Sequence, residues 1–553
     1  MASPPYPAGN ITNRAVRAGY WLLPSLLCLT IYWLGLRTWF WQDDFAWLGL
    51  SVGPKETGKL WTILFAPMAQ GTIRPLSERA FFLVFYSLFG LNGVPYRMMA
   101  FATQMANLVL LALVARRLTG SRAAGFWAPV FWVVNSVLVR AMSWNSAYNQ
   151  ILCAFFLLLA FYYLLRHIET GKTRFLVGEW ISFIAGFGAL ELMVLYPALA
   201  FLYALCRARG RLVKTLWMFP VSAAYAALHW YVAPKTPASG YRMEFDASVF
   251  SSLWTYWQWA LGPARIPDAN LVIPNWVVQV GTAVLSLCLL GFAAWKLRRK
   301  EWLAGFLLGW FVIVLAPVLP LRDHLSVYYL TIPTIGLAVL GAWGFCEAWQ
   351  RGGALRTVSL LAATAYLAAS LPVARYETRW DYENARAART LVRGVARARE
   401  LHPGKVILLT GVNGDLFWTA IVEKPFRLVG VTDVYLVPGS EESIEARPGL
   451  DQVSDYELPP GPALKALEEN RAVVYAVGSQ RLTNVTPVFR ALARDRWHTS
   501  QEPRRVDAGS PLFEGQLGPT WYWSEGTYRW MPKQATVPGC SDMLLCIMLR
   551  LCA

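Results

Sequence analysis

The chain has 553 residues, of which 56% are hydrophobic, 14% are aromatic and only 15% are charged, and its formal net charge is +17. Soluble proteins carry about 25% charged residues, so this composition excludes an ordinary soluble enzyme and indicates a membrane protein with several spans. Nucleic-acid binding is also disfavoured, because most arginines of the first two-thirds lie at the ends of apolar segments, where membrane orientation requires them, and no basic stripe interleaved with aromatic residues is present.

About eleven apolar segments follow one another and are long enough, or nearly long enough, to cross a bilayer. In chain order they are Gly19–Leu36, Tyr96–Ala115, Ala123–Val139, Ala147–Leu165, Phe175–Ala189, Leu192–Leu205, Leu216–Val232, Val272–Ala294, Trp302–Leu319, Val327–Trp349 and Val358–Val373. The loops on one side are short and contain Arg or Lys, whereas the two long loops, 41–94 and 233–270, fall on the other side. This pattern predicts an integral protein of the bacterial inner or plasma membrane type, with its amino terminus in the cytoplasm.

The first long outer loop begins with Trp41-Gln-Asp-Asp-Phe-Ala-Trp47 and continues to Arg74-Pro-Leu76. The two adjacent carboxylates emerge directly after the first span, where charge can be solvated. They are either an interfacial cap among tryptophans or a catalytic site at the membrane surface. Further along, the apolar run Phe81–Leu88 is short for a crossing and predicts a helix in the outer interface, with a true span as the alternative.

The composition changes at Arg375, which divides the chain into a transmembrane domain, 1–374, and an extracytoplasmic α/β domain, 375–553. The second domain opens with a charged, Arg-rich segment at helical spacing, and short apolar runs bounded by turn residues then predict strands. The expected elements are a helix over Tyr376–Leu401, strands over Lys405–Thr410, Phe426–Leu436 and Ala472–Val477, and a strand or hairpin over Trp521–Trp530.

The outer loops contain the groups that a phosphate-linked lipid substrate would need. Because phosphate leaves as an anion, the reaction requires a base for the acceptor hydroxyl and cations for the phosphate. Asp43 and Asp44 are the candidate base, since neighbouring carboxylates resist simultaneous ionisation and one pKa would move toward working pH. Alternatively they bind a divalent metal. Arg74 would hold phosphate with its planar fork, assisted by Arg79 or Arg97.

Three further candidates each have a structural alternative. Glu191, between the fifth and sixth apolar segments, would contact donor or acceptor, or is a solvated loop charge. Asn145, at the start of the fourth segment, would bind a sugar hydroxyl, although helix packing is the competing role. His324, beside Asp323, would lie at the rim of the site, or the two form a solvated pair.

Several different short motifs follow one another over about residues 15–350. The aromatic-flanked Asp-Asp is followed by Arg-Pro-Leu and by an apolar run ending Leu-Phe-Gly. The later motifs are Arg116-Arg-Leu-Thr-Gly120, Trp144-Asn-Ser146, Leu190-Glu191, Tyr196-Pro197, Ala316-Pro-Val-Leu-Pro320, Tyr328-Tyr-Leu330 and Ile332-Pro333. In this order the sequence resembles the GT-C superfamily of polytopic glycosyltransferases, most closely its protein O-mannosyltransferase-like branch.

The resemblance implies transfer of a monosaccharide from a polyprenyl-phosphate donor to a hydroxyl of a protein, glycan or lipid acceptor at the outer face, with inversion at the anomeric carbon. The acidic residue of the family falls on Asp43 or Asp44, with a slight preference for Asp44 as the base, and its arginine falls on Arg74. Two features depart from the family: Leu190 stands where lysine is frequent, and a compact domain stands where soluble repeats are frequent. No cofactor is expected apart from the divalent metal that the acidic pair would bind.

Two other functions compete with this hypothesis. A secondary transporter or lipid flippase would show internal repeats, with helices broken by Gly or Pro at matching positions of two halves. The sequence lacks that symmetry, since its long loops and its tail have no counterparts. A catalytically inactive GT-C-like scaffold is the remaining alternative.

Overall fold

The computed structural model describes residues 14–52, 60–65, 72–232, 242–445, 452–478, 480–491, 520–524 and 527–531. The chain divides into two compact units. The membrane unit comprises Met1–Thr38 and Thr57–Tyr382, and the sheet unit comprises Trp39–Glu56 and Glu383–Ala553. The segment that follows the first apolar helix therefore groups with the C-terminal residues.

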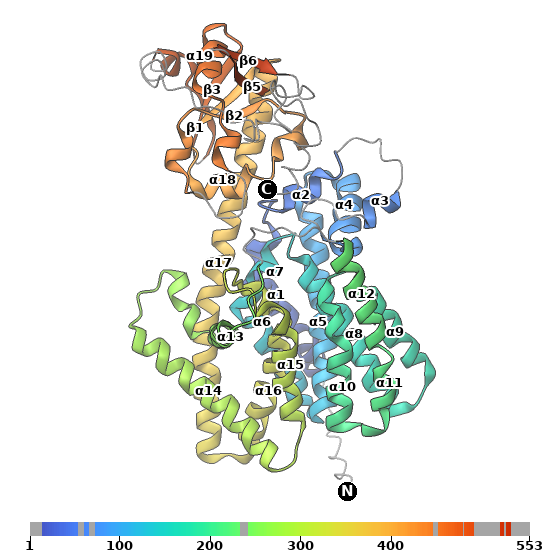
Figure 1. The fold of residues 1–553 in the computed structure, drawn as a ribbon. Helices are drawn as coiled ribbons and strands as arrows, with labels where there is room; N and C mark the ends of the chain where they lie inside the picture. The colour runs from blue at the N-terminus through green and yellow to red at the C-terminus, as the bar shows by residue number, and fades with distance from the viewer. Residues whose placement is uncertain are drawn as a thin grey trace. The chain divides into compact units, whose positions relative to one another are not determined.

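Long apolar helices dominate the membrane unit (Figure 1). Among the described residues, five helices are long and apolar enough to cross a bilayer, and a bent pair makes a sixth candidate. The five are α1 (Arg14–Leu36), α5 (Gly93–Thr119), α8 (Tyr148–Thr170), α14 (Asn275–Arg298) and α17 (Gly353–Leu401). Shorter helices are α9 (Thr173–Phe187), α10 (Tyr196–Arg207), α12 (Phe219–Val232), α13 (Ser248–Leu261), α15 (Leu303–Leu315) and α16 (Thr334–Arg351). The predicted class, a mostly helical integral membrane protein, is confirmed.

The bent pair corrects the continuous helix predicted over Ala123–Val139. Helix α6 (Arg122–Val134) ends at Asn135, and the chain then turns by 61° into the segment Ser136–Ser143. Asn135 is extended, with φ −68° and ψ 127°, and its side chain accepts a hydrogen bond from the Val137 amide at 3.1 Å. The same side chain donates to the Ala260 carbonyl at 2.9 Å, so it caps the new helix and anchors it to α13.

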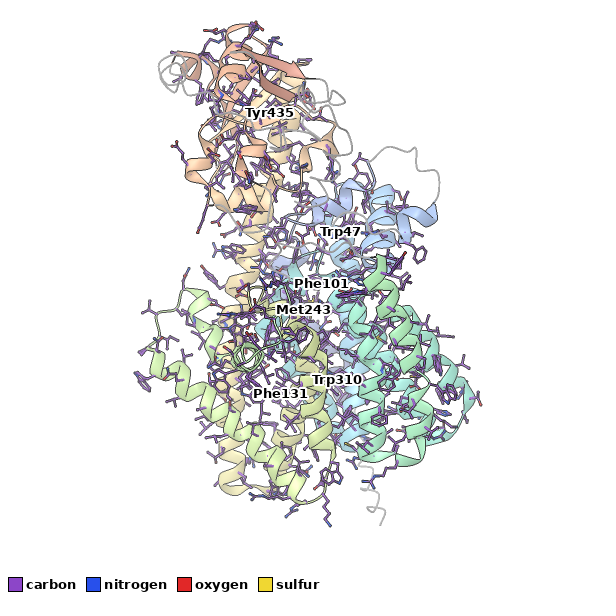
Figure 2. The ribbon with its side chains drawn as sticks, viewed as in Figure 1. Trp47, Phe101, Phe131, Met243, Trp310 and Tyr435 are labelled. Carbon is purple, nitrogen blue, oxygen red and sulfur yellow. The ribbon has the colours of Figure 1, made fainter. Side chains whose placement is uncertain are left out.

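Buried tryptophans join helices within the membrane unit. Trp132 on α6 donates to the Thr331 carbonyl at 2.9 Å, and Trp310 on α15 donates to the Ile332 carbonyl at 3.1 Å. Figure 2 labels Trp310 among the helices of this unit. A Cβ added at Gly336 would lie 2.5 Å from the Leu307 carbonyl oxygen, so glycine permits α15 and α16 to approach closely. Small residues at such crossings are typical of helix packing in membranes.

Helix α17 corrects the predicted separation of a last span from a charged surface helix. It is one helix of 49 residues with Pro372 in its interior. Ion pairs between Arg140 and Asp381 and between Arg265 and Glu377 hold the segment after the proline within the membrane unit. These contacts offset the one backbone hydrogen bond that a proline removes.

The sheet unit contains a four-stranded mixed sheet of order β2-β1-β3-β4. Strand β1 (Val406–Thr410) pairs in parallel with β2 (Val434–Leu436) and β3 (Ala472–Val477), and β4 (Leu482–Asn484) is antiparallel to β3. Leu408, Val474 and Leu467 of α19 (Pro460–Glu468) belong to its core. A hairpin of β5 (Thr520–Ser524) and β6 (Thr527–Met531) follows, so the predicted C-terminal α/β fold is confirmed.

One strand prediction was wrong over part of its length. The strands expected at Lys405–Thr410 and Ala472–Val477 are present, but Phe426–Leu436 is not one strand. Its first part belongs to the 3₁₀ helix η9 (Pro425–Val429), which ends at Gly430 with φ 71°. Pro425 presets the helical φ, and glycine adopts the left-handed conformation without strain, so the strand starts only at Val434.

Candidate functional site

A π-helix positions Arg74 and Arg79, which follow the pair Asp43-Asp44 in the sequence. This helix, η2 (Pro75–Ala80), has Arg74 at its amino-terminal cap and contains Glu78 and Arg79. π-Helical turns are rare in proteins, but those that occur often lie at functional sites. The chain continues into α4 (Phe81–Phe89), whose nine residues are too few to cross a bilayer. The helix in the interface therefore stays the prediction at this place.

Backbone contacts fix η2 beside the connection between α9 and the 3₁₀ helix η4 (Glu191–Leu195). The Leu76 amide donates to the Gly188 carbonyl at 2.8 Å, and the Ser77 hydroxyl donates to the Ala189 carbonyl at 2.6 Å. A Cβ at Gly188 would lie 2.7 Å from the Leu76 side chain, so the lack of a side chain at Gly188 permits this close approach. These contacts bring Arg74 next to Glu191, a residue 117 positions later in the sequence.

Two carboxylates bind the guanidinium of Arg74. Its Nε and Nη2 donate to the two oxygens of Glu191 at 2.7 and 2.6 Å, and its Nη1 forms an ion pair with Glu78. The side chain of Arg74 is 16% exposed, that of Glu78 1% and that of Glu191 38%. Glu78 is thus the buried partner of the arginine and Glu191 the accessible one.

The pKa values of this cluster follow from the pairing. Burial raises the pKa of Glu191, but the charge and the hydrogen bonds of Arg74 lower it further, to about 2. Burial lowers the pKa of Arg74, and the two carboxylates more than reverse this and raise it above its ordinary value. Glu191 and Arg74 are therefore charged at neutral pH, and Arg74 is a fixed cation.

Polar neighbours complete the surroundings of Glu78. Its carboxylate accepts hydrogen bonds from the Thr72 hydroxyl and, at 3.3 Å, from Asn149 of α8. Arg79 is fully buried and donates to the Thr72 carbonyl at 2.7 Å. Sequence analysis assigned no site role to Glu78, although its spacing of four residues from Arg74 is the spacing at which helical side chains pair.

The other predicted site residues of the membrane unit lie in different surroundings. Asn145 is buried and accepts from Arg97 Nη1 at 3.4 Å, while Arg97 Nε donates to the Gly35 carbonyl at 3.0 Å. His324 is half-buried, its ring centroid lies 6.1 Å from that of Tyr329, and burial lowers its pKa. Asn145 thus joins an arginine that was itself a candidate for phosphate binding.

Sequence analysis missed a second buried acidic group in the membrane unit. Asp381 of α17 is fully buried, pairs with Arg140 and accepts from the Ser143 hydroxyl. Four residues earlier, Glu377 pairs with Arg265. The charged composition of this segment indicated a solvated surface helix, whereas the spacing of four residues between the two acids was the available signal that they share one face.

The acidic pair Asp43-Asp44 belongs to the sheet unit. Asp44 begins α2 (Asp44–Gly49) and is fully buried, and its Oδ2 accepts from the Trp41 amide at 3.3 Å. Asp43 is partly exposed. Residues far along the chain hold this turn, since the Gln42 amide donates to the Thr419 carbonyl at 2.7 Å.

Helix α2 also packs against η9 of the sheet unit. Arg427 Nη2 donates to the Phe45 carbonyl at 3.4 Å, across 382 sequence positions. A Cβ at Gly49 would lie 1.7 Å from the same guanidinium nitrogen, so glycine leaves the room that Arg427 occupies. The C-terminal residues therefore position the segment that carries Asp43 and Asp44.

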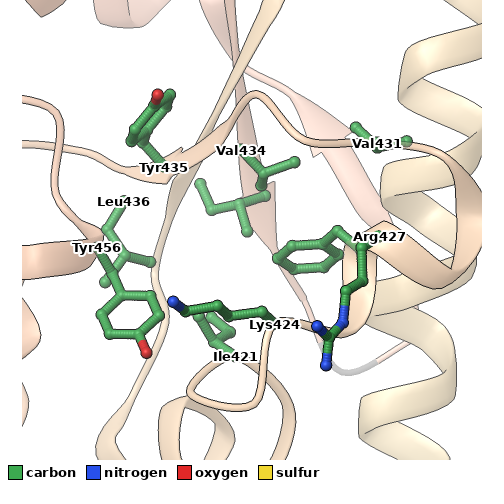
Figure 3. Close-up of a pocket in the computed structure, with 10 residues that line it drawn as sticks. Ile421, Lys424, Arg427, Val431, Val434, Tyr435, Leu436 and Tyr456 are labelled. Carbon is green, nitrogen blue, oxygen red and sulfur yellow. The ribbon is translucent and has the colours of Figure 1, made fainter. Parts of the chain in front are cut away.

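A small cavity lies beside η9. Its volume is about 10 Å³, and Lys424, Arg427 and Tyr456 are among its lining residues (Figure 3). This is about the space of one water molecule, which is too small for a sugar or a phosphate. The cavity is therefore not a substrate pocket.

The metal prediction rests on the acidic pair alone. Within the described parts of the chain, no three His, Cys, Asp or Glu side chains gather in a way that could hold a metal ion. Magnesium sites frequently use one or two carboxylates together with phosphate oxygens of the substrate. Asp43 and Asp44 match that donor set, so the divalent metal remains a prediction.

Comparisons with known proteins show similarity at the level of the fold. No protein-family model matches the chain, and no curated protein matches it. The solved structure of ArnT from Cupriavidus metallidurans bound to undecaprenyl phosphate is similar with 13% identity and a TM-score of 0.47, over 86% of this chain and 95% of that chain. Archaeal oligosaccharyltransferase AglB from Archaeoglobus fulgidus, in complex with an inhibitory peptide and a dolichol-phosphate, is similar with 11% identity and a TM-score of 0.46, over 96% of this chain and 76% of that chain.

Proposed function

We propose that this chain is an integral-membrane glycosyltransferase that moves a monosaccharide from a polyprenyl-phosphate donor to an acceptor hydroxyl, with inversion. The ordered motifs that resemble the GT-C superfamily support the reaction class. The observation that carries the proposal is the Arg74 cluster, in which a fixed cation has one buried and one accessible carboxylate partner. Such a cation is suited to holding an anionic leaving group.

Phosphate binding would occur by exchange at Arg74. Two of its nitrogens are taken up by Glu191, which is 38% exposed, while Glu78 is only 1% exposed. The donor phosphate would displace Glu191 and take over the bidentate contact, because guanidinium forks bind carboxylate and phosphate in the same geometry. Glu78 would keep Arg74 in place during the exchange.

The acceptor would be activated by the acidic pair. Asp43 is partly exposed, whereas Asp44 is fully buried and accepts the Trp41 amide, which supports Asp43 as the base and Asp44 as the residue that holds the turn. The acceptor oxygen would attack the anomeric carbon while the bond between that carbon and the phosphate oxygen breaks. The hydroxyl proton would pass to the Asp43 carboxylate, and the polyprenyl phosphate would leave as an anion, with a divalent metal as the alternative use of the pair.

The finer topology belongs to the same proposal. About eleven crossings would include shorter apolar helices such as Leu303–Val318. Arg and Lys at the loops would keep the amino terminus in the cytoplasm and place the C-terminal domain outside. Arg79, Asn145 and His324 would contribute to donor or acceptor binding, and the acceptor would be a protein, a glycan or a lipid. The protein O-mannosyltransferase-like branch is the specific family that the motifs favour.

The experiment is sugar transfer by the purified full chain in proteoliposomes. Radiolabelled polyprenyl-phosphate sugars are incubated with candidate acceptors, and wild type is compared with Asp43→Asn and Arg74→Lys. We expect each variant to lose about 100-fold or more in turnover, because one loses the base and the other the planar fork. Asp415→Asn and Arg209→Lys, at exposed positions of the same residue types, should keep full turnover.

Three outcomes would contradict the proposal. Unchanged turnover in both site variants would remove the assigned residues. Substrate flux across the bilayer without sugar transfer would identify a transporter or flippase. Donor binding without turnover in the wild-type chain, across the polyprenyl-phosphate sugars tested, would identify a catalytically inactive scaffold.

A further inference from the structure

The membrane unit contains an apolar groove whose lining residues are distant in sequence from the Arg74 cluster. It has a volume of about 440 Å³ and is bordered by α14, α16 and α17 (Figure 1), with α6 and α13 contributing further residues. Its lining along α16 extends from Thr334 to Arg351, the two ends of that helix. A helix of 18 residues is about 27 Å long, which approaches the thickness of the hydrocarbon core.

Small residues keep this groove open. Gly291 of α14 and Gly341 of α16 both line it. A Cβ added at Gly291 would meet nothing within 4 Å, and one added at Gly341 would meet only ordinary contacts, at 3.7 Å or more. The side chains around them are apolar, and Phe131, Leu289 and Phe292 are among them. The groove therefore has the volume and lining of a site for an apolar chain.

One end of the groove carries a cluster of basic and aromatic side chains. Trp295 and Arg351 line the groove there, and the Arg351 guanidinium lies over the Trp295 ring at 3.9 Å. Arg299 lies over the same ring at 4.4 Å. Five residues after Arg351 in the sequence, Arg356 lies over Trp349 at 3.8 Å. Stacking on tryptophan holds these guanidinium groups in fixed positions without neutralising their charge.

Basic charge exceeds acidic charge at this end. Lys296 forms ion pairs with Glu301, at 2.9 Å, and with Glu347, and Arg351 shares Glu347 at 3.3 Å. Within the described residues, neither Arg299 nor Arg356 has an ion pair with a carboxylate. Four basic side chains thus face two acidic ones, and the surplus of positive charge lies where the apolar groove ends.

We propose that this groove binds an anionic glycerophospholipid, with its phosphate on the cluster of Arg299, Arg351 and Arg356 and its acyl chain along α16. The chemistry of the two parts matches the two parts of such a lipid. Guanidinium groups bind phosphate oxygens in bidentate geometry. Basic pockets between membrane helices on the cytoplasmic side select anionic headgroups, and this end carries the Lys and Arg pattern of a cytoplasmic loop.

The lipid would also complete the packing of α14. Only 17% of the apolar stretch of this helix is buried within the chain, compared with 61% for α5. An acyl chain in the groove would lie along Cys288, Leu289 and Gly291 of this helix and would connect it to α16 and α17. The bound phospholipid would therefore stabilise the helix that has few contacts of its own.

Lipid retention by the full chain tests this site. The protein is reconstituted in vesicles of phosphatidylcholine and phosphatidylglycerol at three to one, extracted in mild detergent, and analysed by native mass spectrometry for bound phospholipid. We expect selective retention of phosphatidylglycerol by the wild-type chain. The triple variant Arg299→Gln, Arg351→Gln, Arg356→Gln should lose at least tenfold, since each basic side chain contributes about fivefold.

A groove-filling variant separates the apolar part from the headgroup part. Gly291→Leu combined with Gly341→Leu should reduce retention of both lipids, because leucines would occupy the acyl position. The matched controls are Arg209→Gln, at an exposed arginine of another basic loop, and Leu287→Ala, at a residue of α14 that is 72% exposed. Both controls should retain wild-type amounts of phosphatidylglycerol. Thermal unfolding, measured in parallel, verifies that each variant is folded.

Four results would overturn the proposal. They are equal retention of phosphatidylcholine and phosphatidylglycerol by the wild-type chain, undiminished retention by the folded triple variant, undiminished retention by the folded groove-filling variant, and displacement of phosphatidylglycerol by stoichiometric polyprenyl phosphate. The last result would assign the groove to the donor of the proposed reaction. Loss of sugar transfer has no bearing on these outcomes, so the site stands or falls independently of the glycosyltransferase proposal.

Discussion

Glu191 of the membrane unit has a pKa below the ordinary value of a glutamate, whereas Glu457 of the sheet unit has a pKa above it. Burial raises both, yet Arg74 lowers the pKa of Glu191 to about 2. Among the residues that the structure describes, no cation pairs with Glu457. Its carboxylate accepts the amides of Gly439 and Glu441, and its pKa stays raised to about 7, with nearby Glu442 adding to the effect of burial.

The difference shows that a guanidinium lowers the pKa of a carboxylate more strongly than backbone amides do. Hydrogen bonds from amides favour the charged carboxylate, but at Glu457 they are weaker than the cost of removing it from water. A guanidinium that donates two hydrogen bonds and carries a full charge reverses the balance at Glu191. Glu191 is therefore suited to positioning a cation, whereas Glu457 makes the stability of its unit depend on pH.

Removing the cation should abolish the contrast and gives the largest expected effect. Arg74→Met removes the shorter ion pair of the buried Glu78 and leaves it the 4.0 Å pair with Arg79, and breaking a buried pair costs about 3–5 kcal/mol. In the wild-type chain the contribution of Glu191 is present above its ordinary pKa of 4.5 and is lost as the pH falls toward 2. Without Arg74, only a backbone hydrogen bond and His229 oppose the effect of burial on Glu191, so its pKa should rise and its contribution to stability at neutral pH should shrink.

Denaturant unfolding of the full chain between pH 4 and pH 8 measures this change. Arg209→Met, at an exposed arginine, is the control and should leave the unfolding curves as in the wild-type chain. If Arg74→Met unfolds at the wild-type denaturant concentration across this pH range, the cluster does not hold η2 and the account of Glu191 is wrong.

Glu457 gives the second effect, in the sheet unit. Because its folded pKa of about 7 exceeds the ordinary 4.5, the folded state binds more protons between these values and its stability should decrease as pH rises through that window. The loss is on the order of 1–3 kcal/mol. Glu457→Gln should remove most of this pH dependence, read by proteolysis of the full chain in denaturant. The control Glu400→Gln, at a side chain that is 63% exposed, should keep the pH dependence of the wild-type chain. If the stability of Glu457→Gln changes with pH as strongly as that of the wild-type chain, the role assigned to the burial of Glu457 is wrong.

The sequence predicted those features that depend on local pattern. Apolar length identified the membrane-spanning class, and short β-branched runs located β1 and β3 within one or two residues. It also identified Arg74 and Glu191 as candidates from charge beside apolar segments. It did not predict that these two are paired, because the contact joins residues 117 positions apart and depends on the turn at Gly188.

The remaining differences arise from side chains that act over long distances. Asn135 breaks a segment whose hydropathy alone indicates a continuous helix, and it does so through a bond to Ala260. Ion pairs of Glu377 and Asp381 keep α17 continuous where the change of composition indicated a break. The segment Trp39–Glu56 groups with the C-terminal residues through contacts such as that of Arg427 with Phe45, which no local pattern reveals.

Glu191→Gln gives the smallest expected effect on stability and sharpens the comparison most directly. The variant keeps a hydrogen-bond acceptor for Arg74 but removes the charge, and Glu191 is 38% exposed, so the loss should be about 1 kcal/mol. Glu169→Gln, at a surface acid paired with Arg117 and Arg166, should lose less, at most about 0.5 kcal/mol. If donor phosphate displaces Glu191 from Arg74, as the proposed function requires, the neutral amide competes less well and the KM for the donor should fall a few-fold. A KM that rises instead would mean that Glu191 contacts the donor itself, and Arg74 would then bind phosphate without exchange.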